Sequence, residues 1–227
     1  SGGSHILTPR SLIFAIIGLS LLAGQQGCQE RLIATPYVSR NAAAAEVFNG
    51  LSPDLQTPTI PVLYVTDRLK IESDERGVRY GHGRSRSAAF GEALVSFSPE
   101  PTWEELVRVS TSGEREREFD LRVSRTTELG SFQPLPSLYV PRDGRIARNP
   151  IAAQKYESEF ADFQAILRQW LRRTDRKEVM VFVHGFANRF DDAVLRLAQA
   201  WHMGGRQGVP IVYTWPAGSG GPLGYAY

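Results

Sequence analysis

Cysteine is almost missing from this chain of 227 residues, which has one, Cys28, and therefore no intrachain disulfide. Lysine is scarce as well: arginine supplies 23 of the 26 basic residues, and the formal net charge is only +2. So small a net charge gives no electrostatic support for binding to nucleic acid. The four histidines are scattered and have no metal-ligand spacing. We therefore expect no nucleic-acid partner, no metal and no other cofactor.

Long apolar runs are also rare, and the one that stands out is SLIFAIIGLSLLAG at residues 11–24. It is shorter than the about 20 residues that a membrane-spanning helix needs. It resembles the apolar core of a secretory signal, and Cys28 follows it as the lipidated cysteine follows a lipoprotein signal. We expect an exported protein of the bacterial cell envelope, either periplasmic or anchored to the membrane by this segment or by a lipid on Cys28. A buried helix with an idle thiol is the alternative.

The chain divides into three parts by composition. Residues 1–28 form the signal or anchor region described above. Residues 29–58 lack clear periodicity and contain several prolines, which indicates a tether. Residues 59–227 have ordinary globular composition and are long enough for one sizeable core.

The first half of this domain predicts antiparallel strands. Residues 60–68 (IPVLYVTDR) have the composition of a buried strand, and Glu92–Ser98 that of a second strand after a Gly-rich loop that begins at Arg79. Residues 117–125 alternate charged and apolar side chains, as a half-exposed antiparallel strand does. Residues 130–150 are rich in Pro, Gly and Arg, which indicates a loop.

The second half predicts a parallel βαβ unit preceded by a helix. Apolar residues recur at spacings of three and four from Tyr156 to Trp170, and again from Phe190 to Trp201, as on the buried face of a helix. Between these helices, residues 178–186 form a continuous apolar run that is typical of a central parallel strand covered on both faces. Residues 209–217 predict a further buried strand. The sequence of elements indicates an open α/β sheet.

A histidine and a glycine end the first of these apolar strands, in VMVFVHGFANRF at 179–190. Ligands of open α/β sheets bind at the carboxyl ends of the strands, where His184 and Gly185 lie. Glycine lets the backbone approach a substrate closely. The next two amides, of Phe186 and Ala187, lie near a helix N-terminus, and two such donors suit an oxyanion.

The segments VFVHGFANRFDDAV and IVYTWPAGSGGPLGYAY resemble the α/β-hydrolase superfamily. More narrowly, they resemble an uncharacterised bacterial family with an N-terminal signal, a YVTDR-type first strand and a YGHGRS-type loop. The resemblance covers roughly residues 57–227. It implies an α/β fold of antiparallel N-terminal strands followed by a parallel βαβ unit, with helices on both faces. It also implies that Phe186 or Ala187 supplies an oxyanion-hole amide, while His184 and Gly185 shape the loop.

For several side chains the sequence is consistent with two roles. His184 is more consistent with a hydrogen-bonded structural histidine than with proton transfer, because the family's catalytic histidine comes late in the chain. Trp215 and Tyr225 form either a wall of the substrate pocket or the packing around a strand exit. His82 lies in the YGHGRSRS segment, which either holds an anion through its arginines and glycine-flanked amides or is a solvated turn.

The catalytic machinery implied by the resemblance is a nucleophile, an acid and a histidine, in that order. Ser219 lies in AGSGG, a relaxed form of the nucleophile turn, but the Gly-Gly-Pro-Leu-Gly that follows begins a helix poorly. No Asp, Glu or His comes after it. We therefore expect Ser219 to be a loop serine and this chain to be the N-terminal part of a hydrolase, with an incomplete sheet and no activity alone.

Two functions from different classes compete at this point. The first is a serine esterase-like hydrolase that transfers an acyl group from a small ester or amide to water through an acyl-enzyme. The second is a non-catalytic cell-envelope protein that uses a hydrolase-like scaffold for binding. Nucleotide binding through GHGRS has little support, because the P-loop pattern and the Rossmann glycine spacing are both missing.

Overall fold

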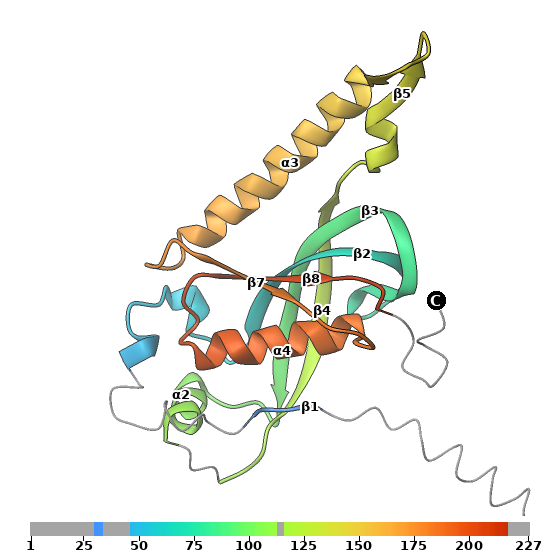
Figure 1. Ribbon diagram of the computed structural model, residues 1–227. Helices are drawn as coiled ribbons and strands as arrows, with labels where there is room; N and C mark the ends of the chain where they lie inside the picture. Colours follow the sequence, from blue (N-terminus) through green and yellow to red (C-terminus); the bar gives the residue numbers. More distant parts are fainter. Residues whose placement is uncertain (1–29, 34–45, 113–115, 218–227) are drawn as a thin grey trace, which may run out of the picture.

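A computed structural model describes residues 30–33, 46–112 and 116–217 (Figure 1). Its main feature is a six-stranded sheet in the order β1-β4-β3-β2-β8-β7. The strands are β1 (Glu30–Arg31), β2 (Ile60–Asp74), β3 (Gly77–Ser98), β4 (Asp120–Ser131), β7 (Val179–Val183) and β8 (Val209–Thr214). β1 to β4 pair antiparallel, whereas β8 pairs parallel with both β2 and β7.

The β2–β3 hairpin is longer than the sequence indicated, because the Gly-rich segment from Arg79 is strand rather than loop. Gly81 and Gly83 lie against Ile71 and Leu69 of β2, and a Cβ on either glycine would meet those side chains at 3.0 and 3.3 Å. The two glycines therefore let the strands pack closely. Register shifts along β2 mark bulges, which increase the local twist, and the hairpin curls over in Figure 1.

The predicted βαβ unit is confirmed. Helix α4 (Phe190–Met203) connects β7 to β8 and buries Val194, Leu197 and Trp201 against the sheet. It ends at Gly204, and the following Gly205 has a φ of 79°, which favours glycine. Parallel strands need a connection of about a dozen residues or more, and the 14-residue helix α4 provides it between β7 and β8.

The C-terminal half of helix α3 (Pro150–Leu171) packs on the opposite face of the sheet. Trp170 packs there with Leu63, Val209 and Ile211, near the C-terminal end of the helix. The segment before α3 is not a simple loop: it contains the 3-10 turn η5 (Leu135–Leu138) and a hairpin of β5 (Tyr139–Arg142) and β6 (Arg145–Arg148). With helices on both faces of a mixed sheet, the predicted α/β class is confirmed.

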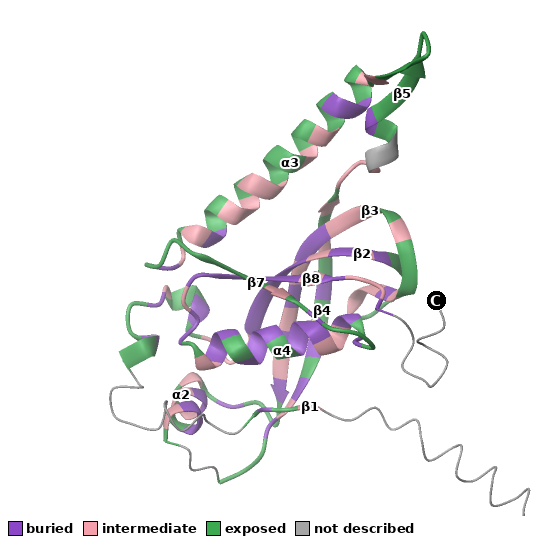
Figure 2. Cartoon of the chain, in the orientation of Figure 1, coloured by how far each residue is buried: buried purple, intermediate pink, exposed green. Residues whose placement is uncertain are grey.

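The position of β7 differs from the prediction of a central, covered strand. β7 is the last strand of the described sheet, and the residues Val181 and Val183 are 61% and 57% exposed. α3 packs on β8 and β4 and leaves these valines uncovered, so β7 is mostly green in Figure 2. The apolar run correctly indicated a strand, but it could not report which neighbours the strand has among the described residues.

The core between the sheet and α4 also takes side chains from outside the predicted domain. Phe48, Leu51 and Leu55 are buried in it, although they belong to the stretch assigned to a tether. Helix α2 (Trp103–Thr111), which the sequence analysis did not identify, adds Leu106 and Val109. The described part of residues 46–58, including the 3-10 turn η4 (Pro53–Leu55), is therefore packed against the fold.

Among the described residues, no helix is long and apolar enough to cross a membrane. The apolar segment 11–24 and Cys28, on which the anchor prediction rests, lie outside the described residues.

Candidate functional site

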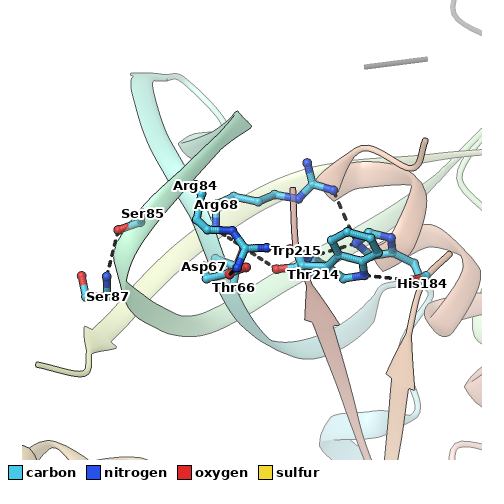
Figure 3. Close-up of polar contacts among 9 residues, drawn as sticks. All are labelled: Thr66, Asp67, Arg68, Arg84, Ser85, Ser87, His184, Thr214 and Trp215. Carbon is cyan, nitrogen blue, oxygen red and sulfur yellow. Dashed lines mark hydrogen bonds and ion pairs between the residues drawn. The ribbon is translucent and has the colours of Figure 1, made fainter. Parts of the chain in front are cut away.

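The candidate site is the loop from His184 to Arg189 that joins β7 to α4; we call it the His184 loop. It lies where the parallel pairing of β2, β8 and β7 ends (Figure 3). Thr66 of β2 and Thr214 of β8 are fully buried and bonded to each other there: Thr66 Oγ1 donates to the Thr214 carbonyl at 2.9 Å, and Thr214 Oγ1 to Thr66 Oγ1 at 2.8 Å. These bonds fix the strand ends that carry the site.

His184 is a buried residue whose two ring nitrogens are both engaged. The backbone amide of Trp215 donates to Nε2 at 3.1 Å, so Nε2 carries no proton and Nδ1 donates to the Gly185 carbonyl at 2.7 Å. Burial, with a smaller contribution from Arg68, lowers the pKa of His184. The ring is therefore neutral and held in one tautomer, an arrangement that fits the structural interpretation of this histidine.

Trp215 holds His184 from the other side. The two rings stack with centroids 5.7 Å apart and an interplanar angle of 4°, and Trp215 Nε1 donates to the His184 carbonyl at 3.0 Å. Of the two interpretations of Trp215, these contacts support packing that orients the loop. Tyr225, the other aromatic residue of that prediction, lies outside the described residues, and so does Ser219.

Arg68 is a residue of the candidate site that the sequence analysis did not single out. Its side chain extends from β2 and is only 2% exposed as a residue. One Nη donates to the Asn188 carbonyl at 2.6 Å and lies 3.4 Å from His184 Nε2, and the other donates to the Gly81 carbonyl at 3.2 Å. Arg68 thus connects β2, β3 and the His184 loop, and places a positive charge next to the backbone of this loop at Asn188.

The backbone of the loop is held in a strained form. Ala187 has a φ of 59°, in the left-handed region that costs a non-glycine residue about 1 kcal/mol. The Asn188 side-chain amide donates to the carbonyls of Gly185 and Phe186 at 3.1 and 3.0 Å. The Ala187 amide donates to the Ala217 carbonyl at 3.0 Å. In this conformation the Ala187 amide is already engaged, so an oxyanion role for it requires that bond to open.

Gly185 has open space beside it. A Cβ built on this residue meets no atom of the described residues within 4 Å, its two chain neighbours apart, and Gly185 is not among the glycines with a positive φ. Packing among the described residues and backbone conformation therefore give no reason for glycine here. The open space fits the prediction that a ligand approaches the backbone at this point.

A serine–histidine hydrogen bond does occur among the described residues, but it is far from this loop. Ser110 Oγ lies 2.9 Å from His202 Nε2, and Arg206 Nε donates to His202 Nδ1 at 3.0 Å. Since an arginine can only donate, Nδ1 is the acceptor and Nε2 donates to Ser110. His202 therefore cannot accept the proton of Ser110, and the fully buried pair is part of the core and not a nucleophile with its base.

The two buried histidines give the fold a pH dependence. Burial lowers the pKa of His202 well below its ordinary value of 6.5, and also lowers that of His184. Between those lowered pKa values and 6.5 the unfolded chain binds more protons than the folded chain, so stability is complete above about pH 6.5 and falls as the pH drops. We expect the urea midpoint to decrease from pH 7 to pH 5. In His202→Gln this decrease should be smaller, and an equal decrease in both proteins would contradict this explanation.

No cluster of three His, Cys, Asp or Glu with metal-binding geometry is found in the described ranges. Residues 159–227 match a family described as an alpha/beta hydrolase of unknown function (DUF900). The match includes most of α3 and all of β7, the His184 loop, α4 and β8. No curated protein and no solved structure matches the chain. The match supports the predicted resemblance to an uncharacterised α/β-hydrolase family and places the candidate loop inside the matched region.

Proposed function

We propose, from the premise that this chain carries part of a hydrolase-like α/β scaffold, that the protein is a serine esterase-like hydrolase whose His184 loop binds the oxyanion. The observation that carries the proposal is the open space beside Gly185 at the end of β7, among the described residues. The loop that contains Gly185 is held in place by the buried polar side chains of Arg68, His184 and Asn188. The match of this region to an α/β-hydrolase family supports it. The substrate is a small ester or amide, and the reaction transfers its acyl group to water.

The chemistry assigned to the loop is electrostatic. When a nucleophile adds to the substrate carbonyl, negative charge develops on the carbonyl oxygen, and donors fixed in advance stabilise it. We assign this role to the amide of Phe186, close to the N-terminus of α4, where the helix dipole also favours negative charge. Arg68 adds a positive charge behind the loop. His184 takes no part in proton transfer, because both of its ring nitrogens are bonded within the loop.

We assign the roles of nucleophile, general base and acid to none of the described residues. His184 and His202 are both engaged in ways that prevent them from activating a serine. This observation favours the second candidate function, a non-catalytic binding protein on the same scaffold. In both cases we propose an exported protein of the cell envelope, on the grounds of the apolar segment 11–24 and of Cys28.

Gly185→Ala tests the proposal without disturbing the fold. The added Cβ meets none of the described residues beyond its chain neighbours, so we expect the free energy of unfolding to change by less than about 0.5 kcal/mol. A substrate that approaches this backbone would be displaced, and we expect kcat/KM for 4-nitrophenyl butyrate to fall roughly 10²-fold. The measurement uses the protein produced at its natural length.

Gly204→Ala is the matched control. Its Cβ would make only ordinary contacts, the nearest at 3.4 Å, and the residue lies at the far end of α4. It should leave esterase activity unchanged. Full activity in Gly185→Ala would mean that no substrate approaches this loop, and would refute the assignment.

A further inference from the structure

A cavity of about 360 Å³ lies on the face of the sheet on which α3 packs, close to the candidate site. Its walls come from β2, β3, β8, the segment after β4, and α3. That volume is within the roughly 300–1,000 Å³ typical of small-molecule sites. Figure 3 labels Asp67, Arg84, Ser85 and Ser87 of this cavity, with Asp67 and Arg84 beside Thr66 and Thr214. Trp215 follows Thr214 at the end of β8, and His184 follows the end of β7. A ligand in this cavity therefore lies at the same end of the sheet as the His184 loop.

The charged side chains of this cavity do not balance. Asp67 is its one carboxylate, and it pairs with Arg84, whose Nη1 lies 3.3 Å from Asp67 Oδ2. Arg86 also lines the cavity, is exposed, and has no ion pair with any residue that the structure describes. Among the residues that line the cavity, the outcome is a surplus of one positive charge. The hydroxyl-bearing Ser85 and Ser87 lie on either side of Arg86 and also line the cavity.

The rest of the cavity wall is mostly aromatic. It consists of Phe132, Tyr156 of α3 and Tyr213 of β8. The ring of Phe132 is 5.9 Å from that of Tyr156 and 5.0 Å from that of the buried Phe90, which holds it in place. Gln133 is the remaining polar residue of this wall, and Glu159 accepts both its backbone and its side-chain hydrogen bonds. Most of this wall is therefore aromatic carbon, which suits an apolar body.

We propose that this cavity binds a small organic monoanion, a carboxylate attached to an aromatic or branched apolar body. The carboxylate contacts Arg86 and the neighbouring serine hydroxyls, and the apolar body packs on Phe132, Tyr156 and Tyr213. A single surplus charge matches a carboxylate better than a phosphate dianion. The further step, that the bound carboxylate is part of a substrate of this protein, rests on the proposed function.

Binding is measured on the full chain by isothermal titration calorimetry, with three probes of one ring system: 2-naphthoate, the neutral 2-naphthalenemethanol and the dianionic 1-naphthyl phosphate. We expect 2-naphthoate to bind most tightly. In Arg86→Gln its affinity should fall about 5- to 10-fold, as expected when one charge-assisted hydrogen bond is lost, while that of 2-naphthalenemethanol stays unchanged. Tyr156→Ala should weaken both probes.

Arg122→Gln is the control, because Arg122 is an exposed arginine of β4 outside the cavity and its loss should change nothing. Equal affinity for the acid and the alcohol, or an unchanged affinity in Arg86→Gln, would overturn the proposal. Tighter binding of the phosphate would replace the carboxylate by a dianion and also overturn it. Since no turnover is measured, this result is independent of whether the protein hydrolyses esters.

Discussion

Arg68→Met should lower the free energy of unfolding by about 2–3 kcal/mol, because it removes a charged donor from two backbone carbonyls. Those carbonyls belong to Gly81 and Asn188, on two separate elements. Methionine fills much of the same space, so the loss reflects hydrogen bonding and not a cavity. Urea denaturation of the two proteins measures the difference.

The same substitution should loosen the His184 loop specifically. Arg68 is bonded to the Asn188 carbonyl and lies beside His184. We therefore expect the substitution to speed up amide hydrogen exchange more at residues 184–189 than in the strands of the sheet, relative to the unsubstituted protein. Arg122→Met, at an exposed position of β4, is the matched control and should alter neither property. If Arg68→Met left both the stability and the loop exchange unchanged, the hydrogen bonds of Arg68 would not hold the His184 loop in place.

Arg206→Met should cost more, about 3–5 kcal/mol of unfolding free energy, because Arg206 is fully buried and joins several segments. One of its Nη atoms donates to the carbonyls of Leu55, Thr57 and Thr59 at 2.6–3.0 Å, and its Nε donates to His202. Burial lowers the pKa of Arg206 to about 9, which still leaves the guanidinium charged at neutral pH. Its loss leaves three carbonyls without their donor.

The measurement is again urea denaturation, with the m-value as an internal check on two-state behaviour. Residues 46–58 should be the first to lose protection from hydrogen exchange, because the three carbonyls belong to η4 and to the approach to β2. A reduction of less than about 1 kcal/mol would show that these segments are held mainly by the apolar contacts of Phe48, Leu51 and Leu55.

The sequence predicted the elements of the second half well, because their apolar spacing is regular. α3, α4, β7 and β8 all lie where the periodicity indicated them. The edge position of β7 could not be predicted, since an apolar run reports the character of a strand and not its neighbours. The sequence predicts a loop for the Gly-rich segment of β3, because glycine and arginine obscure its alternation. In the structure its glycines allow β2 and β3 to pack closely.

The sequence predicted the loop between β7 and α4 that we take as the candidate site, but not the contacts that hold this loop in place. The strand-end His-Gly pair indicated the loop, yet the left-handed φ of Ala187 and the bond from its amide to Ala217 depend on contacts distant in sequence. A signal for Arg68 was present: strand alternation puts it on the same face as Val62, Tyr64 and Thr66, all buried. No local pattern indicated Arg206, whose partners lie about 150 residues earlier in the chain.

The most direct test of the central claim is covalent labelling by a fluorophosphonate, followed by intact-mass spectrometry, on the protein produced from its own gene at its natural length. A serine hydrolase with the His184 loop as its oxyanion site should gain the mass of one phosphonate on one serine, and Gly185→Ala should slow the labelling while Gly204→Ala does not. A folded protein that gains no label and hydrolyses no ester would contradict the claim and leave a binding protein on a hydrolase-like scaffold.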